Sequence, residues 1–361
     1  MYDIKVIQIM PEFGLAGAEI MVENLVKELK SKVREVIVLS LYDYHSPITE
    51  RIEKEGIRII YLGKRKGLDL SIIRKIYKVL KQERPDVIHT HRHVMHYVIP
   101  AAVLAGIKKR VHTIHNLANK ELSFFQRILA SFFYKFNKVR PVALSSITQK
   151  SIVKTYKLKP EKVETVFNGI NLSKCLIKSD YNLNGILKIL HIGRFSKPKN
   201  HQVIIECAKL LKGKGIDFEI KLIGQGELLE DVKTKVQQED ITDYIKFLGI
   251  KPSVFEELNQ ADIFILPSLW EGMPMTLIEA MGTGLPIIAS KVGGIPDMID
   301  DGENGILINP VAEELANSII LLYENKELRE KLGKKALSKS INFSATTMCD
   351  NYLKIYKNTI Y

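Results

Sequence analysis

Two glutamates that lie eight positions apart, Glu271 and Glu279, occur in the stretch SLWEGMPMTLIEAMGTGLPIIAS (residues 268–290). Between them, Pro274 fits the first turn of a helix, where its missing N–H costs nothing, so we expect a helix over about 274–281. Glu271 then lies in the loop before the helix, and Glu279 lies more than one turn inside it. The two carboxylates could address one cleft from different depths, or they could be solvated acids on a capped surface helix.

The start of this expected helix offers a second kind of chemistry. The N–H groups around Met275, Thr276 and Leu277 have no partner inside the helix. Because they also sit at the positive end of the helix dipole, they form a place for a phosphate group.

Two cations follow an apolar run in the stretch HIGRFSKPKNHQVII. Arg194 and Lys199 come after Gly193 at the end of an expected strand and just before an expected helix. Fixed cations beside a helix N-terminus can neutralise a diphosphate as its charge develops on departure. Both side chains could instead be solvated loop charges.

Glycine-rich turns follow two other apolar runs. IKLIGQGELLEDV ends a strand with Gly224 and Gly226, a turn that fits either a nucleotide or a tight strand-to-helix connection. MPEFGLAGAEIMVENL joins the first strand to the first helix through Gly14 and Gly17, where backbone N–H groups can approach a ligand. No Gly-Lys-Ser or Gly-Lys-Thr follows, which disfavours hydrolysis of ATP.

Four histidines gather near the ends of two expected strands, in DVIHTHRHVMHY and RVHTIHN: His89, His91, His112 and His115. They lie on different strands without a local acid or cysteine partner, so we expect no metal site. For His89 and His91, hydrogen bonding at a strand end and contact with an acceptor substrate remain open.

These residues must be positioned by alternating strands and helices. Short apolar runs such as IKVIQIM, EVIVLSL and DVIHT alternate with segments of helical period, which indicates buried parallel strands. A polar, Asn-rich stretch near residues 172–186 reads as a linker, after which a second series begins. The fold class is therefore α/β with two doubly wound domains, at 1–175 and 187–342, and a closing helix at 343–361 that we expect to pack back on the first domain.

The composition is that of a soluble globular protein. The chain has 361 residues, which is enough for two domains. Of these residues, 46% are hydrophobic and 26% are charged, a composition that argues against a disordered protein. Neither a leader peptide nor a membrane span is recognisable, so we expect a cytoplasmic protein. The three cysteines lie far apart and predict neither a disulfide framework nor a zinc site.

The formal net charge of +12 is unevenly distributed. Residues 1–180 hold 32 Lys and Arg against 17 Asp and Glu, whereas the remainder holds 21 against 24. The basic half could attract nucleic acid, anionic lipid or a phosphorylated substrate, and charge alone does not choose among them.

The motif PSLWEGMPMTLIEAMGTGLPIIASKVGGIPDMI closely resembles the donor-site signature of glycosyltransferase family 4, whose members have the GT-B fold with a ligand cleft between two facing Rossmann-like domains. The resemblance extends over essentially the whole chain. It implies that Arg194 and Lys199 bind the diphosphate of a nucleotide sugar and that Glu279 accepts hydrogen bonds from the ribose. It also implies that Glu271 lies close to the transferred sugar and that Gly224 lines the nucleobase pocket, together with FLGI.

The first half shows the same resemblance with three departures. His115 matches a histidine that lies at the donor sugar in the family, although Asn116 stands where an aspartate is frequent. The family's Gly-Gly-Ala-Glu appears as AGAE, with Ala16 in place of the first glycine, while Gly17 and Glu19 match. In VETVFNGINLS, the turn at Asn168 is either structural or lines the cleft, and Asn171 replaces the customary aspartate.

The stretch LSFFQRILASFFYKFNKVR combines apolar and basic residues at helical spacing. It is either a helix packed on its domain or an interfacial helix that inserts phenylalanines into an anionic membrane surface. Its apolar stripe consists of Phe124, Phe125, Ile128, Leu129, Phe132, Phe133 and Phe136, and the basic residues around it are Lys120, Arg127, Lys135, Lys138 and Arg140.

Together these features predict a retaining glycosyltransferase that transfers a hexosyl group from a nucleotide diphosphate sugar, with UDP as the expected nucleotide. The expected acceptor is lipid-linked or a saccharide, as in the assembly of bacterial exopolysaccharide, capsule or O-antigen. No cofactor and no metal are expected, because fixed cations take the metal's place. The alternatives are a nucleotide-sugar epimerase of the same architecture and, outside enzymes, a nucleic-acid-binding protein, although no helix-turn-helix, RRM or KH signature is present.

Overall fold

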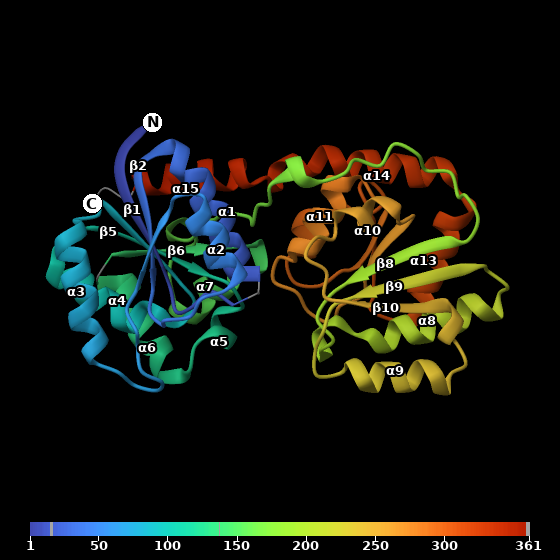
Figure 1. The fold of residues 1–361 in the computed structure, drawn as a ribbon, viewed down its shortest axis with the longest axis horizontal. Coiled ribbons are helices and arrows are strands. Elements are labelled where there is room, and N and C mark those ends of the chain that lie inside the picture. The colour runs from blue at the N-terminus through green and yellow to red at the C-terminus, as the bar shows by residue number, and fades with distance from the viewer. Residues whose placement is uncertain (15–16, 137, 359–361) are drawn as a thin grey trace. The chain divides into compact units, whose positions relative to one another are not determined.

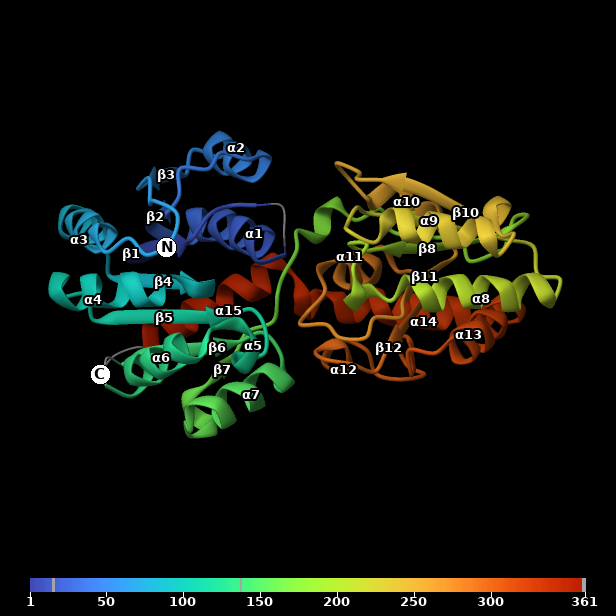
Figure 2. The same ribbon diagram turned by 90° about the horizontal axis from the view of Figure 1, so that it is seen from below.

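The computed structural model describes residues 1–14, 17–136 and 138–358. The chain forms two compact units, Met1–Ile170 with Ala345–Tyr361, and Asn171–Ser344. Each unit is built around its own parallel sheet with helices on both faces (Figures 1 and 2). The α/β fold class with two Rossmann-like halves, as in GT-B proteins, is therefore confirmed.

The first unit contains a seven-stranded sheet in the order β3-β2-β1-β4-β5-β6-β7. Its strands are β1 (Tyr2–Met10), β2 (Val33–Ser40), β3 (Arg58–Tyr61), β4 (Val87–His91), β5 (Lys109–Ile114), β6 (Val139–Ala143) and β7 (Glu164–Thr165). Its helices are α1 (Gly17–Lys32), α2 (Pro47–Lys54), α3 (Ser71–Glu83), α4 (Met95–Ala105), α5 (Ala118–Glu121), α6 (Phe124–Phe136), α7 (Ser146–Tyr156) and α15 (Ala345–Asn358).

The central strands of this sheet are apolar because helices cover both of their faces. In β1, Val6, Ile7 and Ile9 are all fully buried. Helices α3, α4, α6 and α7 share one hydrophobic cluster with the strands, and α3, α4 and α6 lie on the opposite side of the sheet from α1 and α2 in Figure 1. The closing helix α15 packs against α1, and its backbone is joined to the first unit where the Ala345 N–H donates to the Ile170 carbonyl at 2.7 Å.

The second unit contains a six-stranded sheet in the order β10-β9-β8-β11-β12-β13. Its strands are β8 (Leu187–Ile192), β9 (Phe218–Ile223), β10 (Ile245–Gly249), β11 (Ile263–Leu266), β12 (Ile287–Ser290) and β13 (Ile306–Ile308). Its helices are α8 (His201–Gly213), α9 (Leu229–Gln238), α10 (Phe255–Gln260), α11 (Met275–Thr283), α12 (Ile295–Met298), α13 (Ala312–Glu324) and α14 (Lys326–Ser340). In Figure 1, α10, α11 and α14 lie on one side of the sheet, and α8 and α9 lie on the other.

Both sheets reverse their strand order at one point, between β1 and β4 in the first unit and between β8 and β11 in the second. At such a point the connections leave in opposite directions, and a crevice opens beyond the carboxyl ends of the two strands. The loops that follow β8 and β11 carry the predicted donor-site residues. Within the described ranges, no helix is long and apolar enough to cross a membrane.

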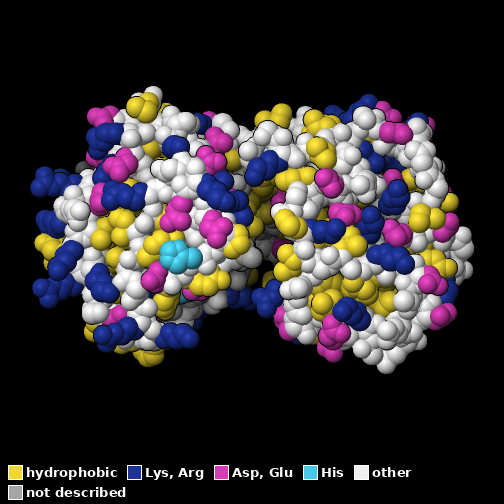
Figure 3. Space-filling model, viewed as in Figure 1, with side chains coloured by type: hydrophobic (Ala, Val, Ile, Leu, Met, Phe, Trp, Pro, Cys, Tyr) yellow, Lys and Arg dark blue, Asp and Glu magenta, His cyan; other side chains and the backbone are white. Residues whose placement is uncertain are grey.

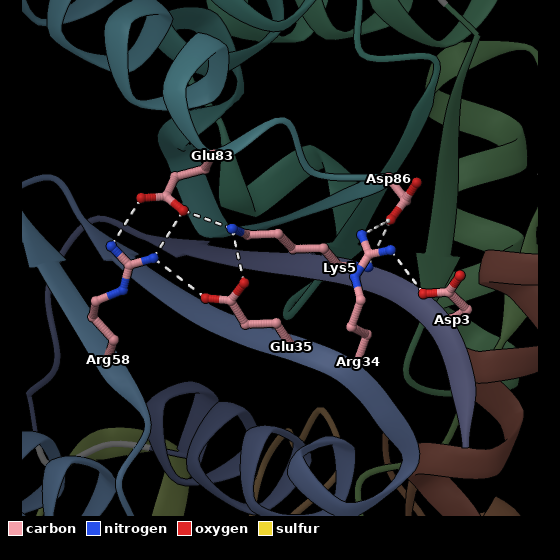
Figure 4. A network of polar contacts seen from close by, with 7 residues as sticks. All are labelled: Asp3, Lys5, Arg34, Glu35, Arg58, Glu83 and Asp86. Carbon is pink, nitrogen blue, oxygen red and sulfur yellow. Dashed lines mark hydrogen bonds and ion pairs between the residues drawn. The ribbon is translucent and has the colours of Figure 1, made fainter.

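An ion-pair network stabilises the opposite, amino-terminal edge of the first sheet (Figure 4). Lys5 on β1 lies 2.7 Å from Glu83 at the end of α3 and 2.8 Å from Glu35 on β2. Arg58 on β3 donates both terminal nitrogens to Glu83 at 2.8 Å. The Arg58 hydrogen bonds, with Lys5 beside them, lower the pKa of Glu83 to about 2.

We expect Glu83→Gln to destabilise the protein at neutral pH by about 1 to 2 kcal/mol, because Arg58 and Glu35 are half exposed and solvent weakens the pairs. Since the folded pKa is depressed, this contribution is present above the unfolded value of about 4.5 and is lost as the pH falls towards 2. Thermal unfolding at pH 7 and pH 3 should show a gap between variant and wild type that shrinks at the lower pH. Glu161→Gln, at an exposed position, is the matched control, and an equal loss in both variants would contradict the network's role.

Candidate functional site

The site in the second unit begins where the loops after β8 and β9 touch through their backbones. The Gly193 N–H donates to the Ile223 carbonyl at 2.9 Å, and the Phe195 N–H donates to the Gln225 carbonyl at 2.9 Å. A Cβ on Gly224, whose φ is +146°, would lie 2.0 Å from the Gly193 oxygen. Glycine is therefore required here for close approach of the two loops, which fixes the path of the chain into Arg194.

The loop after β11 is held by a comparable contact with the loop after β12. Gly293 has a φ of +58°, and a Cβ there would lie 1.7 Å from the backbone oxygen of Glu271. The Gly294 N–H also donates to the Gly272 carbonyl at 3.0 Å. The position of Glu271 is thus determined by backbone packing as well as by its own side chain.

Lys199 and Glu271 form an ion pair that joins the loops of the two strands at the reversal point. The Lys199 Nζ lies 2.7 Å from the Glu271 Oε1, and the side chains are only 17% and 11% exposed. The buried hydroxyl of Ser268 donates to the same carboxylate oxygen at 2.7 Å. Lys199 and Glu271 were both predicted site residues, and the structure brings their side chains into direct contact.

Arg194 is the more exposed of the two predicted cations, and its ion pair lies at the surface. Its Nη2 lies 3.1 Å from Glu227, with side-chain exposures of 71% and 56%. An exposed pair of this kind is worth little free energy, so the guanidinium can exchange Glu227 for a phosphate at small cost. Glu227 belongs to the Gly224–Leu228 connection before α9.

The amino end of α11 is the third element of the site. Helix α11 begins at Met275, with Pro274 as its extended N-cap, one residue later than predicted. Pro274 has no side-chain hydrogen-bonding group, so no side chain of the cap occupies the N–H groups of Met275 and Thr276. The predicted third donor, the Leu277 N–H, instead donates to the Pro274 carbonyl at 3.2 Å, because the first turn of the helix closes on its own cap. The Thr276 hydroxyl is also buried without a hydrogen-bond partner among the described residues. A ligand with phosphate oxygens would satisfy both kinds of donor.

Glu279 lies on the same helix, about one turn beyond Thr276. Its side chain is half-buried, and burial raises the pKa of its carboxyl group to about 7. An acid without a cation beside it is suited to hydroxyl groups, which hydrogen-bond either protonation state. Lys199 instead pairs with Glu271, so the two glutamates differ in electrostatic environment.

The first unit places its predicted histidines in one buried cluster. His91, fully buried at the end of β4, lies with its Nδ1 3.1 Å from the His115 Nε2 and its Nε2 2.8 Å from the Gln8 Oε1. His89 contacts the Tyr356 hydroxyl at 2.7 Å and Thr113 at 2.8 Å. Of the two interpretations left open for His89 and His91, this geometry favours hydrogen bonding within the unit.

His115 differs from the other two because its ring is only half-buried. Burial, with repulsion from Arg92, lowers the pKa of His115 to about 3, and burial lowers the pKa of His89 and His91 well below the usual value. All three rings are therefore neutral at physiological pH. A neutral imidazole has one donor and one acceptor nitrogen.

The loop after β1 shows a different arrangement. A Cβ added at Gly14 would lie in open space, with no heavy atom within 4 Å. Gly17 is the first residue of α1, and Ala16 lies outside the described residues. In α1, the buried carboxylate of Glu19 pairs with Arg92 at 2.5 Å, just after β4. Asn168 is buried, with 5% of its surface exposed.

Three residues in contact with the predicted site were not identified from the sequence: Ser268, Gln8 and Tyr356. Gln8 did leave a signal, because it is a polar residue within the apolar run IKVIQIM of a central strand. A buried amide there requires hydrogen-bond partners. Tyr356 gave no local signal, since its contacts with β1 and β4 arise only when the last helix returns to the first unit.

Within the part of the chain that the structure describes, no three His, Cys, Asp or Glu side chains are placed together as ligands for a metal ion. The histidine cluster instead uses its ring nitrogens in hydrogen bonds to Gln8, Thr113 and Tyr356.

Comparison with known proteins identifies the family. Residues 15–174 match the family described as Glycosyltransferase Family 4, and residues 178–339 match the family described as Glycosyl transferases group 1. The two matches together span both units. The chain belongs to glycosyltransferase family 4, and the predicted transferase class is confirmed.

Individual relatives have similar length and different acceptors. The chain is 28% identical to the UDP-Gal:alpha-D-GlcNAc-diphosphoundecaprenol alpha-1,3-galactosyltransferase of Escherichia coli, over 80% of this chain and 79% of that enzyme. It is also 28% identical to the N-acetyl-alpha-D-glucosaminyl L-malate synthase of Bacillus anthracis, over 81% of this chain and 80% of that enzyme.

Solved structures share the fold at low sequence identity. A glycosyltransferase from Rickettsia africae aligns with a TM-score of 0.84 at 21% identity, covering 99% of this chain and 98% of that one. The Anabaena protein HepE in complex with UDP-glucose aligns with a TM-score of 0.84 at 17% identity, covering 98% and 99%.

The raised pKa of Glu279 leads to a prediction about the stability of the folded protein, which can be tested without a substrate. The folded pKa of about 7 exceeds the unfolded value of about 4.5, so ionisation destabilises the folded state as the pH rises from 4.5 through 7. Glu279→Gln should therefore melt at a higher temperature than wild type at pH 8, with an advantage of about 1 to 2 kcal/mol that shrinks at pH 5. Calorimetry at both pH values measures this, with the exposed Glu313→Gln as control. An advantage that is the same at pH 5 and pH 8 would exclude a buried, titrating carboxyl at this position.

Proposed function

We propose that this protein is a retaining glycosyltransferase that transfers a hexosyl group from a UDP-sugar to a lipid-linked or saccharide acceptor in the synthesis of a surface polysaccharide. The observation that carries the proposal is the Lys199–Glu271 pair at the β8/β11 reversal point, beside the amino end of α11. The choice of UDP as the nucleotide is supported by the names of two similar proteins. The Escherichia coli relative is named for UDP-Gal and a diphosphoundecaprenol-linked acceptor, and HepE was solved in complex with UDP-glucose.

The diphosphate of the donor is bound by two cations and a helix end. Lys199 and Arg194 supply positive charge, and the N–H groups of Met275 and Thr276 supply hydrogen bonds. These groups favour the departing diphosphate more than the intact donor, because its negative charge grows as the glycosidic bond breaks. Gly193 and Gly224 contribute by packing backbone to backbone, which holds the loops after β8 and β9 beside the phosphates and the nucleoside.

The sugar and the ribose are bound by acids and by one histidine. Glu279 accepts hydrogen bonds from the ribose hydroxyls. Glu271 and His115 contact the transferred sugar, orient it and stabilise positive charge near its anomeric carbon. Gly14, Gly17 and Asn168 belong to the part of the first unit that receives the acceptor. His91 positions His115 through the hydrogen bond between their rings.

The reaction follows a front-face route. The bond from the anomeric carbon to the diphosphate oxygen breaks, and the bond to the acceptor oxygen forms on the same face, so the configuration is retained. The departing diphosphate takes the proton of the acceptor hydroxyl, so no separate base is required. The protein contributes position and charge rather than a covalent intermediate.

Lys199→Ala tests the donor site without knowledge of the acceptor. We expect it to weaken binding of UDP at least tenfold in calorimetric titration, because a charge-assisted contact with the diphosphate is removed. Lys197→Ala is the matched control, since Lys197 is an exposed lysine of the same turn, and it should change the affinity less than twofold. Equal affinities of wild type and Lys199→Ala would contradict the assigned role.

Transfer itself is measured with radiolabelled UDP-glucose, UDP-galactose and UDP-N-acetylglucosamine and an extract of polyprenyl-diphosphate-linked saccharides. Wild type should transfer one of these sugars, and Glu271→Ala should reduce the rate at saturating donor at least a hundredfold. NMR of the product should show the same anomeric configuration as the donor. An inverted product, or full activity of Glu271→Ala, would overturn the mechanism.

The first unit also carries a surface suited to an acceptor held in a membrane. Helix α6 packs inward through Ala130, Phe133 and Tyr134, so Phe133, assigned to the apolar stripe from the sequence, belongs to the core. Six apolar side chains of α6 remain exposed: Phe124, Phe125, Ile128, Leu129, Phe132 and Phe136. Basic side chains gather along α3, at the left edge of this unit in Figure 3. This combination supports peripheral contact with an anionic membrane.

Flotation with lipid vesicles tests this contact. Wild type should float with vesicles that contain phosphatidylglycerol and should remain in the dense fraction with pure phosphatidylcholine. Phe125 and Phe136 are 81% and 70% exposed, so a Phe125→Ser/Phe136→Ser variant should lose at least tenfold in vesicle affinity. Leu321→Ser/Ile341→Ser, which alters exposed apolar residues of the second unit, is the control and should float normally. Wild type that fails to float would remove the membrane contact from the proposal.

A further inference from the structure

A continuous chain of hydrogen bonds runs through the first unit from His115 to the closing helix. The His115 Nε2 lies 3.1 Å from the His91 Nδ1, and the His91 Nε2 lies 2.8 Å from the Gln8 Oε1. The Gln8 Nε2 donates to the Tyr356 hydroxyl oxygen at 2.9 Å. The chain joins the residue that follows β5 to β4, β1 and α15. Its members His91, Gln8 and Tyr356 are completely buried.

The chemistry of Gln8 gives this chain a direction. Its Oε1 can only accept, so the His91 Nε2 carries the hydrogen of that contact. Because His91 is neutral, its Nδ1 is then an acceptor, and the hydrogen between the two rings belongs to the His115 Nε2. His115 is therefore left with a lone pair on Nδ1, a nitrogen for which no described residue supplies a hydrogen bond.

Tyr356 holds Gln8 in the orientation that sets this direction. The Tyr356 oxygen accepts a hydrogen bond from the Gln8 Nε2, so the Tyr356 hydroxyl donates its own hydrogen to the His89 Nδ1 at 2.7 Å. The opposite ring nitrogen of His89 then donates to Thr113 at 2.8 Å. Gln8 could reverse its amide only if Tyr356 and His89 reversed their hydrogens as well, which makes the arrangement cooperative.

We infer that Gln8 and Tyr356 are positioning residues that hold His115 as its Nε2–H tautomer, so that Nδ1 accepts a hydrogen bond from a hydroxyl of the donor sugar. This inference rests on the proposed function, which brings His115 to the transferred sugar. It assigns a role in the reaction to the closing helix, whose Tyr356 touches no substrate. The chain acts through hydrogen position alone, since no member of it changes charge.

Tyr356→Phe tests the inference, because it removes one oxygen and keeps the ring. In ¹⁵N NMR of protein labelled at histidine, the ring shifts report which nitrogen carries the hydrogen, and a His115→Asn spectrum identifies the His115 signals. Wild type should show His115 with hydrogen on Nε2, and Tyr356→Phe should show a mixture of the two tautomers. Gln8→Met, which removes the acceptor of His91, should show the same change and serves if Tyr356→Phe does not fold.

Tyr352→Phe is the matched control. Tyr352 lies one turn earlier on α15 and is equally buried, but its hydroxyl contacts Thr113 at 2.8 Å, beyond the His89 end of the chain. It should leave the His115 tautomer as in wild type. Hydrogen on Nδ1 of His115 in wild type, or an unchanged tautomer in both Tyr356→Phe and Gln8→Met, would overturn the inference.

Steady-state kinetics separate this inference from the proposed function. With the active UDP-sugar, Tyr356→Phe should lower kcat five- to tenfold and leave KM for the donor within twofold, whereas Tyr352→Phe should leave both within twofold. Wild type without transferase activity on any UDP-sugar would contradict the proposed function, while the NMR result would still decide the tautomer. A shifted tautomer with an unchanged kcat would overturn the role of Nδ1 in the reaction.

Discussion

Contact between backbones at the carboxyl edge of the second sheet is the constraint on which the candidate site depends. Gly224 lies against Gly193, and Gly293 lies against Glu271, at distances that no side chain larger than hydrogen permits. These contacts join the loop after β8 to the loop after β9 and the loop after β11 to the loop after β12. The Leu269 N–H, which donates to the Pro198 carbonyl at 2.8 Å, joins the two pairs. Lys199 and Glu271 can then meet across the β8/β11 reversal point without depending on flexible loops for their position.

The architecture could be predicted from the sequence because parallel strands buried on both faces must be apolar along their whole length. Such runs are unambiguous in β1, β2, β8 and β11. The short strand β7 was less predictable, because only Glu164–Thr165 of the apolar stretch pair with β6. Helix α11 begins one residue later than expected because Pro274 adopts an extended N-cap conformation rather than a helical one.

The candidate site was predictable only as far as its parts are local in sequence. Cations, glycines and acids that directly follow strands could be recognised one motif at a time. The contact between Lys199 and Glu271, separated by 72 positions, follows from strand order, which the apolar runs do not reveal. The contact between Gln8 and Tyr356, separated by 348 positions, follows from the return of α15 to the first unit.

Burial, rather than the ion pairs at the opposite edge of the sheet, keeps the histidines of the first unit neutral. The ion pairs of Lys5, Arg58 and Glu83 lie at the amino-terminal edge, where they stabilise the fold without a ligand. At the carboxyl edge, burial keeps His91 and His115 uncharged. A protonated ring there would repel the positive charge that develops on a sugar as its diphosphate departs, whereas a neutral ring with a directed lone pair does not. Burial of the cluster therefore serves the proposed chemistry as well as the packing of the sheet.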